Sequence, residues 1–129
     1  MRFTTAESTV EYTPEYGGNR DEPCPATFRL EPLNAGELRA HRLRLTRAVD
    51  RKRSSDAQDE VNSVLSNGVL SLSGVTLRTI GTDGTVVDTD LTSVAEFLEQ
   101  APEKLKLELY EALTNPTKLD GGVEGIRGN

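Results

Sequence analysis

The first third of the chain contains two short stretches that favour β-strands, separated by a segment rich in turn-forming residues. Residues 9–13 and 26–33 alternate polar and apolar positions, as half-buried strands do. Between them, residues 14–23 hold two prolines and the pair Gly17 and Gly18, which is typical of a loop. We therefore predict two strands that pair antiparallel across this loop.

Two helices are predicted next. Asn34 is a good N-cap residue, and Glu37 stands three positions later, in the spacing of a capping box. The first helix should run to about Arg53, with one apolar stripe made of Leu38, Leu45 and Val49 and with Ala48 at its edge. Ser54–Asp56 should end it and cap a second helix, which stops at Asn67–Gly68. The apolar positions of that second helix are Val61, Val64 and Leu65.

From residue 69 to residue 88 the apolar positions recur with a shorter period. Val75, Leu77 and Thr79 alternate with polar residues, and the dipeptide Asp83–Gly84 stands between two β-rich runs. An Asp-Gly pair in that setting is the strongest short hairpin signal. The pattern therefore predicts a β-hairpin with its turn at this dipeptide.

Two further helices are predicted near the end of the chain. Asp90 or Ser93 caps the first, with Glu96 at the capping-box spacing from Ser93. Its shared face is made of Leu91, Val94, Ala95 and Leu98, with Phe97 beside it. Pro102 ends this helix and suits the first turn of the next. The second helix has an amphipathic stripe of Leu105, Leu109, Ala112 and Leu113 and ends at Asn115–Pro116.

Together these elements predict a single α+β domain over residues 1–120. A small antiparallel sheet, formed by the N-terminal strands and the hairpin, packs with three to four helices. The glycine-rich residues 121–129 should form a flexible C-terminal tail.

Composition narrows the function classes. The 129 residues include 15 Lys and Arg against 21 Asp and Glu, a net charge of −6, which argues against a general nucleic-acid-binding domain. A single cysteine excludes an internal disulfide, and one cysteine with one histidine argues against a zinc site. The sequence has no apolar run long enough to cross a membrane and no signal-peptide pattern, so we expect a cytosolic protein.

No catalytic, cofactor-binding or metal-binding motif is recognisable, and we expect no enzyme activity. Asp83, Asp88 and Asp90 lack the spacing of a calcium loop. Glu108 and Glu111 are expected to be solvated on a polar helix face. We expect the single histidine, His41, to lie at the boundary of an apolar face, partly packed and partly in contact with water. We expect the single cysteine, Cys24, to be a free thiol without a functional role.

Charge is unevenly distributed along the chain. Residues 37–53 carry seven basic and two acidic side chains, a net +5, so the rest of the chain carries −11. On a helical wheel Arg44, Arg47 and Arg51 cluster opposite the apolar stripe. Three interpretations stay open. In the first, the arginines form a solvated face whose charge is balanced by acids of the same fold, and in the second they form a docking face for an acidic protein. A contact with nucleic acid is the third and least favoured interpretation.

The order of features resembles a family of small phage proteins. The loop at residues 12–20 leads into residues 28–37 and an arginine-rich helix, followed by residues 90–98, 105–113 and 119–122. This series resembles the tail assembly chaperones and allied tail-morphogenesis proteins encoded beside the tape-measure gene of long-tailed bacteriophages. The loop with its Glu-Tyr-Gly-Gly-Asn-Arg sequence is the most distinctive part.

The resemblance implies a non-enzymatic role in the host cytoplasm. Such chaperones hold the helical, aggregation-prone tape-measure protein until tail-tube subunits assemble around it, so both proteins are candidate partners. The helices around 91–98 and 105–113 could form a groove for an apolar helix, with Leu107 and Tyr110 as contact residues. Against this, the stripe of the second helix, with Leu105, Leu109 and Leu113, is more simply explained as core.

Two rival functions follow from the same features. A structural virion protein, in the tail or in head completion, would remain in the particle. A DNA-associated phage protein would use the basic helix at residues 37–53. The sequence also leaves a homo-oligomer open.

Overall fold

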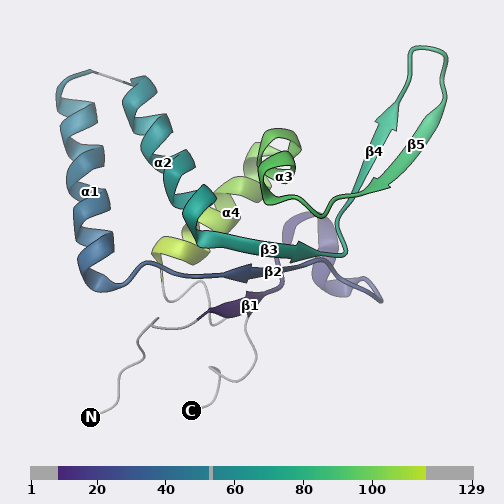
Figure 1. Cartoon of the computed structure of the whole chain (residues 1–129), viewed down its shortest axis with the longest axis horizontal. Helices are drawn as coiled ribbons and strands as arrows, with labels where there is room; N and C mark the ends of the chain where they lie inside the picture. The colour runs from purple at the N-terminus through teal and green to yellow at the C-terminus, as the bar shows by residue number, and fades with distance from the viewer. Residues whose placement is uncertain (1–8, 53, 116–129) are drawn as a thin grey trace, which may run out of the picture.

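The structure, a computed structural model, describes residues 9–52 and 54–115. Within this part of the chain it has four α-helices, one 3₁₀ helix and five strands in two antiparallel sheets, which confirms the α+β class. The predicted domain end at residue 120 and the predicted tail at residues 121–129 lie outside the described residues. Figure 1 shows a small body from which two arms extend, one of helices and one of strands.

The body is built on a three-stranded sheet of order β1-β2-β3. The predicted antiparallel pair is confirmed, because β1 (Val10–Tyr12) pairs with β2 (Thr27–Leu30). The third strand, β3 (Val69–Ser73), pairs antiparallel with β2 and comes from the segment that the sequence pattern assigned only to the hairpin region. Alternate residues of β1 and β2 point into the core, where they meet Val69 and Leu72 of β3.

The loop between β1 and β2 is held by side chains rather than by regular structure. It contains the 3₁₀ helix η1 (Tyr16–Asp21), in which Gly17 and Gly18 both have positive φ. The Asn19 side chain donates to the carbonyls of Pro14 and Ala26 and accepts from the Ala26 amide. These bonds give the distinctive loop sequence a structural role.

Glu108 fixes this loop to the last helix, α4 (Glu103–Thr114). Its carboxylate accepts from the Tyr12 hydroxyl at 2.7 Å and from the amides of Glu15 and Tyr16 at 2.7 and 3.0 Å. Burial, followed by the hydrogen bond to Glu108, raises the pKa of Tyr12 well above its ordinary value, so the hydroxyl stays protonated and donates. The prediction of a solvated Glu108 is therefore wrong: the residue is 9% exposed.

The helices α1 (Ala35–Asp50) and α2 (Ser54–Gly68) form an antiparallel pair, which we call the helical arm. The predicted capping box is present, since Asn34 accepts from the Glu37 amide and Glu37 accepts from the Asn34 amide. The helix α1 ends at Asp50 rather than near Arg53, which lies outside the described residues. Ser54 begins α2, so the segment that should cap this helix forms its first turn instead.

The helix α2 passes directly into β3 at Gly68 with no intervening loop. A Cβ atom at Gly68 would lie 2.6 Å from the buried side chain of Leu113 of α4. The carbonyl of Gly68 also accepts from the amide of Glu31, beyond β2. The helical arm is therefore joined to the sheet at a tightly packed position.

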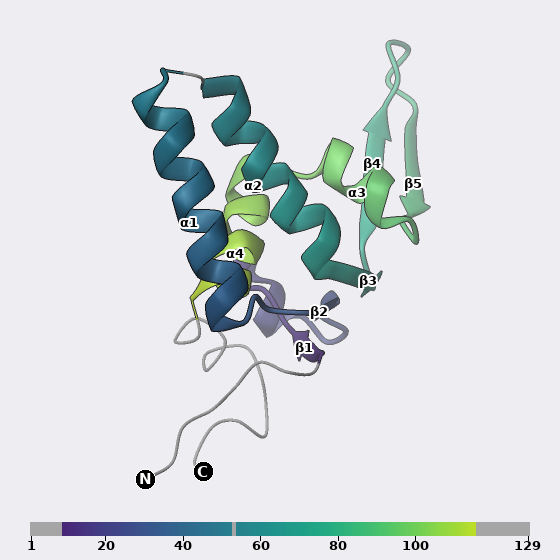
Figure 2. The same ribbon diagram turned by 60° about the vertical axis from the view of Figure 1, so that its left-hand side comes forward.

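The predicted hairpin is confirmed and forms a sheet of its own. Strand β4 (Thr76–Ile80) pairs with β5 (Val86–Asp90), and Gly84 in the turn has φ 84°. The hairpin does not join the N-terminal sheet: the backbone changes direction at Gly74, which has a positive φ, and α3 packs beside β3. Figures 1 and 2 show it extending from the body as a second arm, the β-arm.

The core lies between the first sheet and the helices α2, α3 (Val94–Gln100) and α4. Ser93 caps α3 and Pro102 precedes α4, as predicted. Phe97, which was predicted to lie beside the apolar face of α3, is buried, whereas Ala95, predicted on that face, is exposed. The inward face of α3 is therefore centred on Phe97. The predicted stripe of α4 is largely confirmed, with three of its members buried: Leu109, Ala112 and Leu113.

Candidate functional site

The helical arm has two faces that differ in chemistry. The line of contact between α1 and α2, which we call the seam, passes through the buried Ala48, and one face of the arm lies on each side of it. At 100° per residue, His41 and Ala48 lie on the side of α1 that meets α2, whereas Val49 lies beside it. The predicted stripe through Leu45 and Val49 therefore does not form the buried face, and Val49 is 68% exposed.

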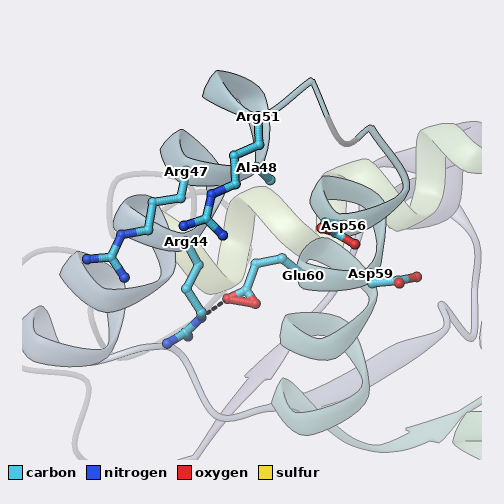
Figure 3. A pocket seen from close by; sticks show the side chains of 7 residues that line it. All are labelled: Arg44, Arg47, Ala48, Arg51, Asp56, Asp59 and Glu60. Atoms are coloured by element: carbon cyan, nitrogen blue, oxygen red, sulfur yellow. Dashed lines mark hydrogen bonds and ion pairs between the residues drawn. The ribbon is translucent and has the colours of Figure 1, made fainter.

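One face of the arm is a charged groove of about 360 Å³. It is lined by Arg44, Arg47, Ala48, Arg51, Asp56, Asp59 and Glu60. Figure 3 shows Arg44 reaching across to Glu60, with which it is hydrogen-bonded and ion-paired. Within the described chain, no acidic side chain pairs with Arg47 or Arg51. The three predicted arginines thus share one face, and one of them, Arg44, is already paired with an acid.

The other face is an apolar groove of about 510 Å³. It is lined by Leu45, Ala48, Val49, Lys52, Ala57, Gln58 and Val61. Two pairs at i, i+4 spacing form it, one on each helix, and Lys52 and Gln58 supply its polar edge. The apolar stripe read from the sequence did not predict this groove, although both pairs stand in the printed sequence.

A buried polar cluster joins the arm to α4. His41 Nε2 lies 2.6 Å from the Tyr110 hydroxyl, and Nδ1 lies 3.4 Å from Glu60 Oε1. Because a carboxylate only accepts, the tautomer with its proton on Nδ1 places that proton toward Glu60, and in this tautomer Nε2 accepts from the Tyr110 hydroxyl. The Glu60 contact is electrostatic, since Nδ1 makes no hydrogen bond with a described residue. His41 is therefore fully buried, and its predicted place at a half-wet boundary is wrong.

The cluster shifts the pKa values of Tyr110 and Glu60. Burial raises the pKa of Tyr110, and the charge of Glu60 adds to this effect. Burial alone would raise the pKa of Glu60, but the hydrogen bond from Arg44 and the contact with His41 outweigh it and lower that pKa. Near neutral pH the tyrosine is thus protonated and the carboxylate charged.

We expect Tyr110→Phe to lower the free energy of unfolding by about 1–2 kcal/mol, because the buried His41 ring loses its hydrogen-bond partner. Urea unfolding followed by circular dichroism measures this. Tyr16→Phe is the matched control, since the Tyr16 ring is exposed. Equal stability of the two variants would contradict the role given to the cluster.

The other predicted contact residues do not form one surface with the arginines. Leu107 is exposed on α4, as expected for a contact residue. Tyr110 is partly buried and faces His41 of α1. The faces of α3 and α4 that could have held an apolar helix are instead occupied by the core.

Other chemistries find little support in the described residues. Residues 9–52 and 54–115 contain no group of three or more His, Cys, Asp or Glu side chains placed to hold a metal. Cys24 is exposed and unbridged. In the same ranges, no helix has the length and apolar character needed to cross a membrane.

Comparisons with protein families, with curated proteins and with solved structures find no match to this chain. The class of molecule is therefore defined by the fold and the surfaces: a small α+β protein with a two-faced helical arm and an exposed β-arm.

Proposed function

We propose that this chain is a tail assembly protein of the chaperone type, which binds an apolar helix of a phage tape-measure protein and catalyses no reaction. The observation that carries the proposal is the apolar groove of the helical arm. Leu45 and Val49 of α1 and Ala57 and Val61 of α2 form its floor. Tail-tube subunits would take over the tape-measure protein when they assemble.

The groove has the form that an amphipathic helix needs. Two helices with apolar residues on one face can accept a third helix and complete a three-helix bundle. The bound helix would present anchors at i, i+3, i+4 and i+7. Lys52 at the polar edge would favour a ligand that carries acidic residues beside its apolar stripe.

The open shape of the groove suits temporary binding. Val49 is already mostly exposed, so the free protein does not have to unfold or open in order to bind. A shallow, partly apolar groove supports weak, reversible association, which a carrier of an assembly intermediate requires. We place this activity in the cytoplasm of the bacterial host.

We expect Val49→Asp to weaken binding of the tape-measure protein by roughly tenfold or more, because a carboxylate would be buried in the apolar contact. The readout is the soluble fraction of co-expressed tape-measure protein, followed by affinity capture. Leu43→Asp is the matched control. Leu43 is an exposed apolar residue of the same helix and does not line the groove.

Wild-type protein that fails to keep the tape-measure protein soluble would contradict the proposal. So would equal loss of binding in both variants, because the effect would then not be specific to the groove. Circular dichroism should show the same helix content for both, since each site is exposed.

The β-arm favours the second candidate, a structural virion protein. Every residue of β5 is exposed, and a sheet of two strands is marginal in water without a partner. A protein that stays in the particle would bury this arm permanently. Mass spectrometry of purified virions separates the two candidates, because a chaperone is absent from mature particles.

The DNA-associated alternative is weaker. Arg44 already pairs with Glu60, so contacts with phosphate would rest mainly on Arg47 and Arg51. Three acids line the same groove and would repel a phosphate backbone.

A further inference from the structure

The tip of the β-arm combines apolar and acidic side chains. Ile80 and Val86 are cross-strand partners next to the turn and are 69% and 52% exposed. Asp83 lies in the turn, where Oδ1 accepts from the Thr85 amide. The hairpin from residue 76 to residue 90 carries one arginine and three aspartates, a net −2. An apolar tip with an acidic turn therefore extends into solvent.

The apolar groove has the complementary composition. Its floor is aliphatic, and Lys52 lies at its edge. Arg51 lines the charged groove on the opposite face near the same end of the arm. Neither Lys52 nor Arg51 has an acidic partner within residues 9–52 and 54–115. An aliphatic floor with cations at one end matches an aliphatic pair followed by an acidic turn.

The two surfaces cannot meet within one molecule in this fold. Figures 1 and 2 show the helical arm and the β-arm on opposite sides of the body, with α3 between them. A strand of five residues is only about 17 Å long, so the tip has no reach back across the body. A contact between the two surfaces therefore requires two copies.

We propose that the tip of the β-arm of one copy binds in the apolar groove of a second copy, so that the protein associates head to tail. Ile80 and Val86 contact the aliphatic floor, and Asp83 lies near Lys52. Such a contact is heterologous: each copy uses one surface for its neighbour ahead and another for its neighbour behind. This self-association uses the groove assigned above to the tape-measure protein, so the two ligands compete.

Sedimentation velocity over a range of protein concentrations tests this with two single variants. Ile80→Asp damages the tip and keeps the groove, whereas Val49→Asp damages the groove and keeps the tip. Each alone should associate at least about tenfold more weakly than the wild type. The control Leu43→Asp should associate as the wild type does.

The decisive sample is an equimolar mixture of Ile80→Asp and Val49→Asp. The intact groove of the first accepts the intact tip of the second, so the mixture should form a 1:1 dimer and nothing larger. A symmetric contact between two β-arms or between two grooves would restore no such dimer. A wild type that stays monomeric, or a mixture that stays monomeric while the wild type associates, would overturn the proposal.

A second tip variant covers the case in which Ile80→Asp disrupts the hairpin. Asp83→Asn keeps the oxygen that accepts from the Thr85 amide and removes the charge. It should weaken association roughly two- to fivefold and reduce its dependence on salt. Unchanged affinity and unchanged salt dependence would exclude the ionic part of the contact.

The outcomes also separate this inference from the proposed function. A monomeric wild type that still binds the tape-measure protein overturns only the self-association. A wild type that associates head to tail without binding the tape-measure protein overturns only the chaperone role.

Discussion

Replacing Glu108 with alanine is expected to lower the free energy of unfolding by about 3–5 kcal/mol, because the buried carboxylate is the acceptor for three donors. Without it the Tyr12 hydroxyl and the amides of Glu15 and Tyr16 lose their common acceptor. The loop between β1 and β2 would then detach from α4. Denaturant unfolding measures the loss.

Two variants calibrate this result. Glu103→Ala removes an exposed carboxylate of the same helix whose ion-pair partner is Lys106, and should cost less than about 0.5 kcal/mol. Tyr12→Phe removes only one of the three donors and should cost about 1–2 kcal/mol. If Glu108→Ala were no more destabilising than Glu103→Ala, Glu108 would not hold the loop.

Replacing Phe97 with alanine should destabilise the fold by about 3–5 kcal/mol, through a large cavity in the core. Phe97 is 1% exposed, and its ring lies 4.9 Å from that of Phe28, centroid to centroid. The helix α3 has only seven residues, so it depends on this contact rather than on its own helix propensity. Thermal and denaturant unfolding both report the effect.

The substitution Phe97→Leu tests whether volume alone explains the loss. It leaves a smaller cavity but removes the tilted ring contact with Phe28. Such an aromatic pair contributes about 0.5–1.5 kcal/mol beyond the burial of its surface. We expect a cost clearly below that of Phe97→Ala. Exposed Ala95 on the same helix is a neutral position, where Ala95→Ser should change little. A stable Phe97→Ala would mean that α3 is not anchored through this ring.

Local signals in the sequence predicted local structure well. The Asn34–Glu37 capping box and the Asp83–Gly84 turn are each decided by groups a few residues apart. Pro102 marks the start of α4 for the same reason, because a missing amide and a fixed φ act where they occur. Such features are predictable because no distant residue takes part in them.

The incorrect predictions of burial have one cause: they depend on contacts between residues that are far apart in the sequence. Glu108 has the spacing of a solvated helix residue, and only the loop that folds over it makes it a buried acceptor. His41 is likewise buried by Tyr110 and Glu60, which stand far away in the sequence. The position of the α1 seam depends on where α2 packs, so periodicity alone placed the buried face too far toward Val49.

The candidate site was predictable in part. The cluster of Arg44, Arg47 and Arg51 follows directly from helical spacing. Helical spacing does not show which of these arginines is paired with an acid, because Glu60 comes from another helix. The apolar groove also needs both helices side by side, so neither helix reveals it separately.

The junction at Gly68 has a mechanical consequence. A helix of 15 residues is about 22 Å long, and here it enters a strand without a flexible linker. The arm is therefore joined to the sheet without a hinge, because Gly68 packs against Leu113 at the junction and Val64 and Leu65 of the same helix lie in the core. A ligand bound at the outer end of the arm is thus held in a fixed position relative to β3 and to the neighbouring strand β2.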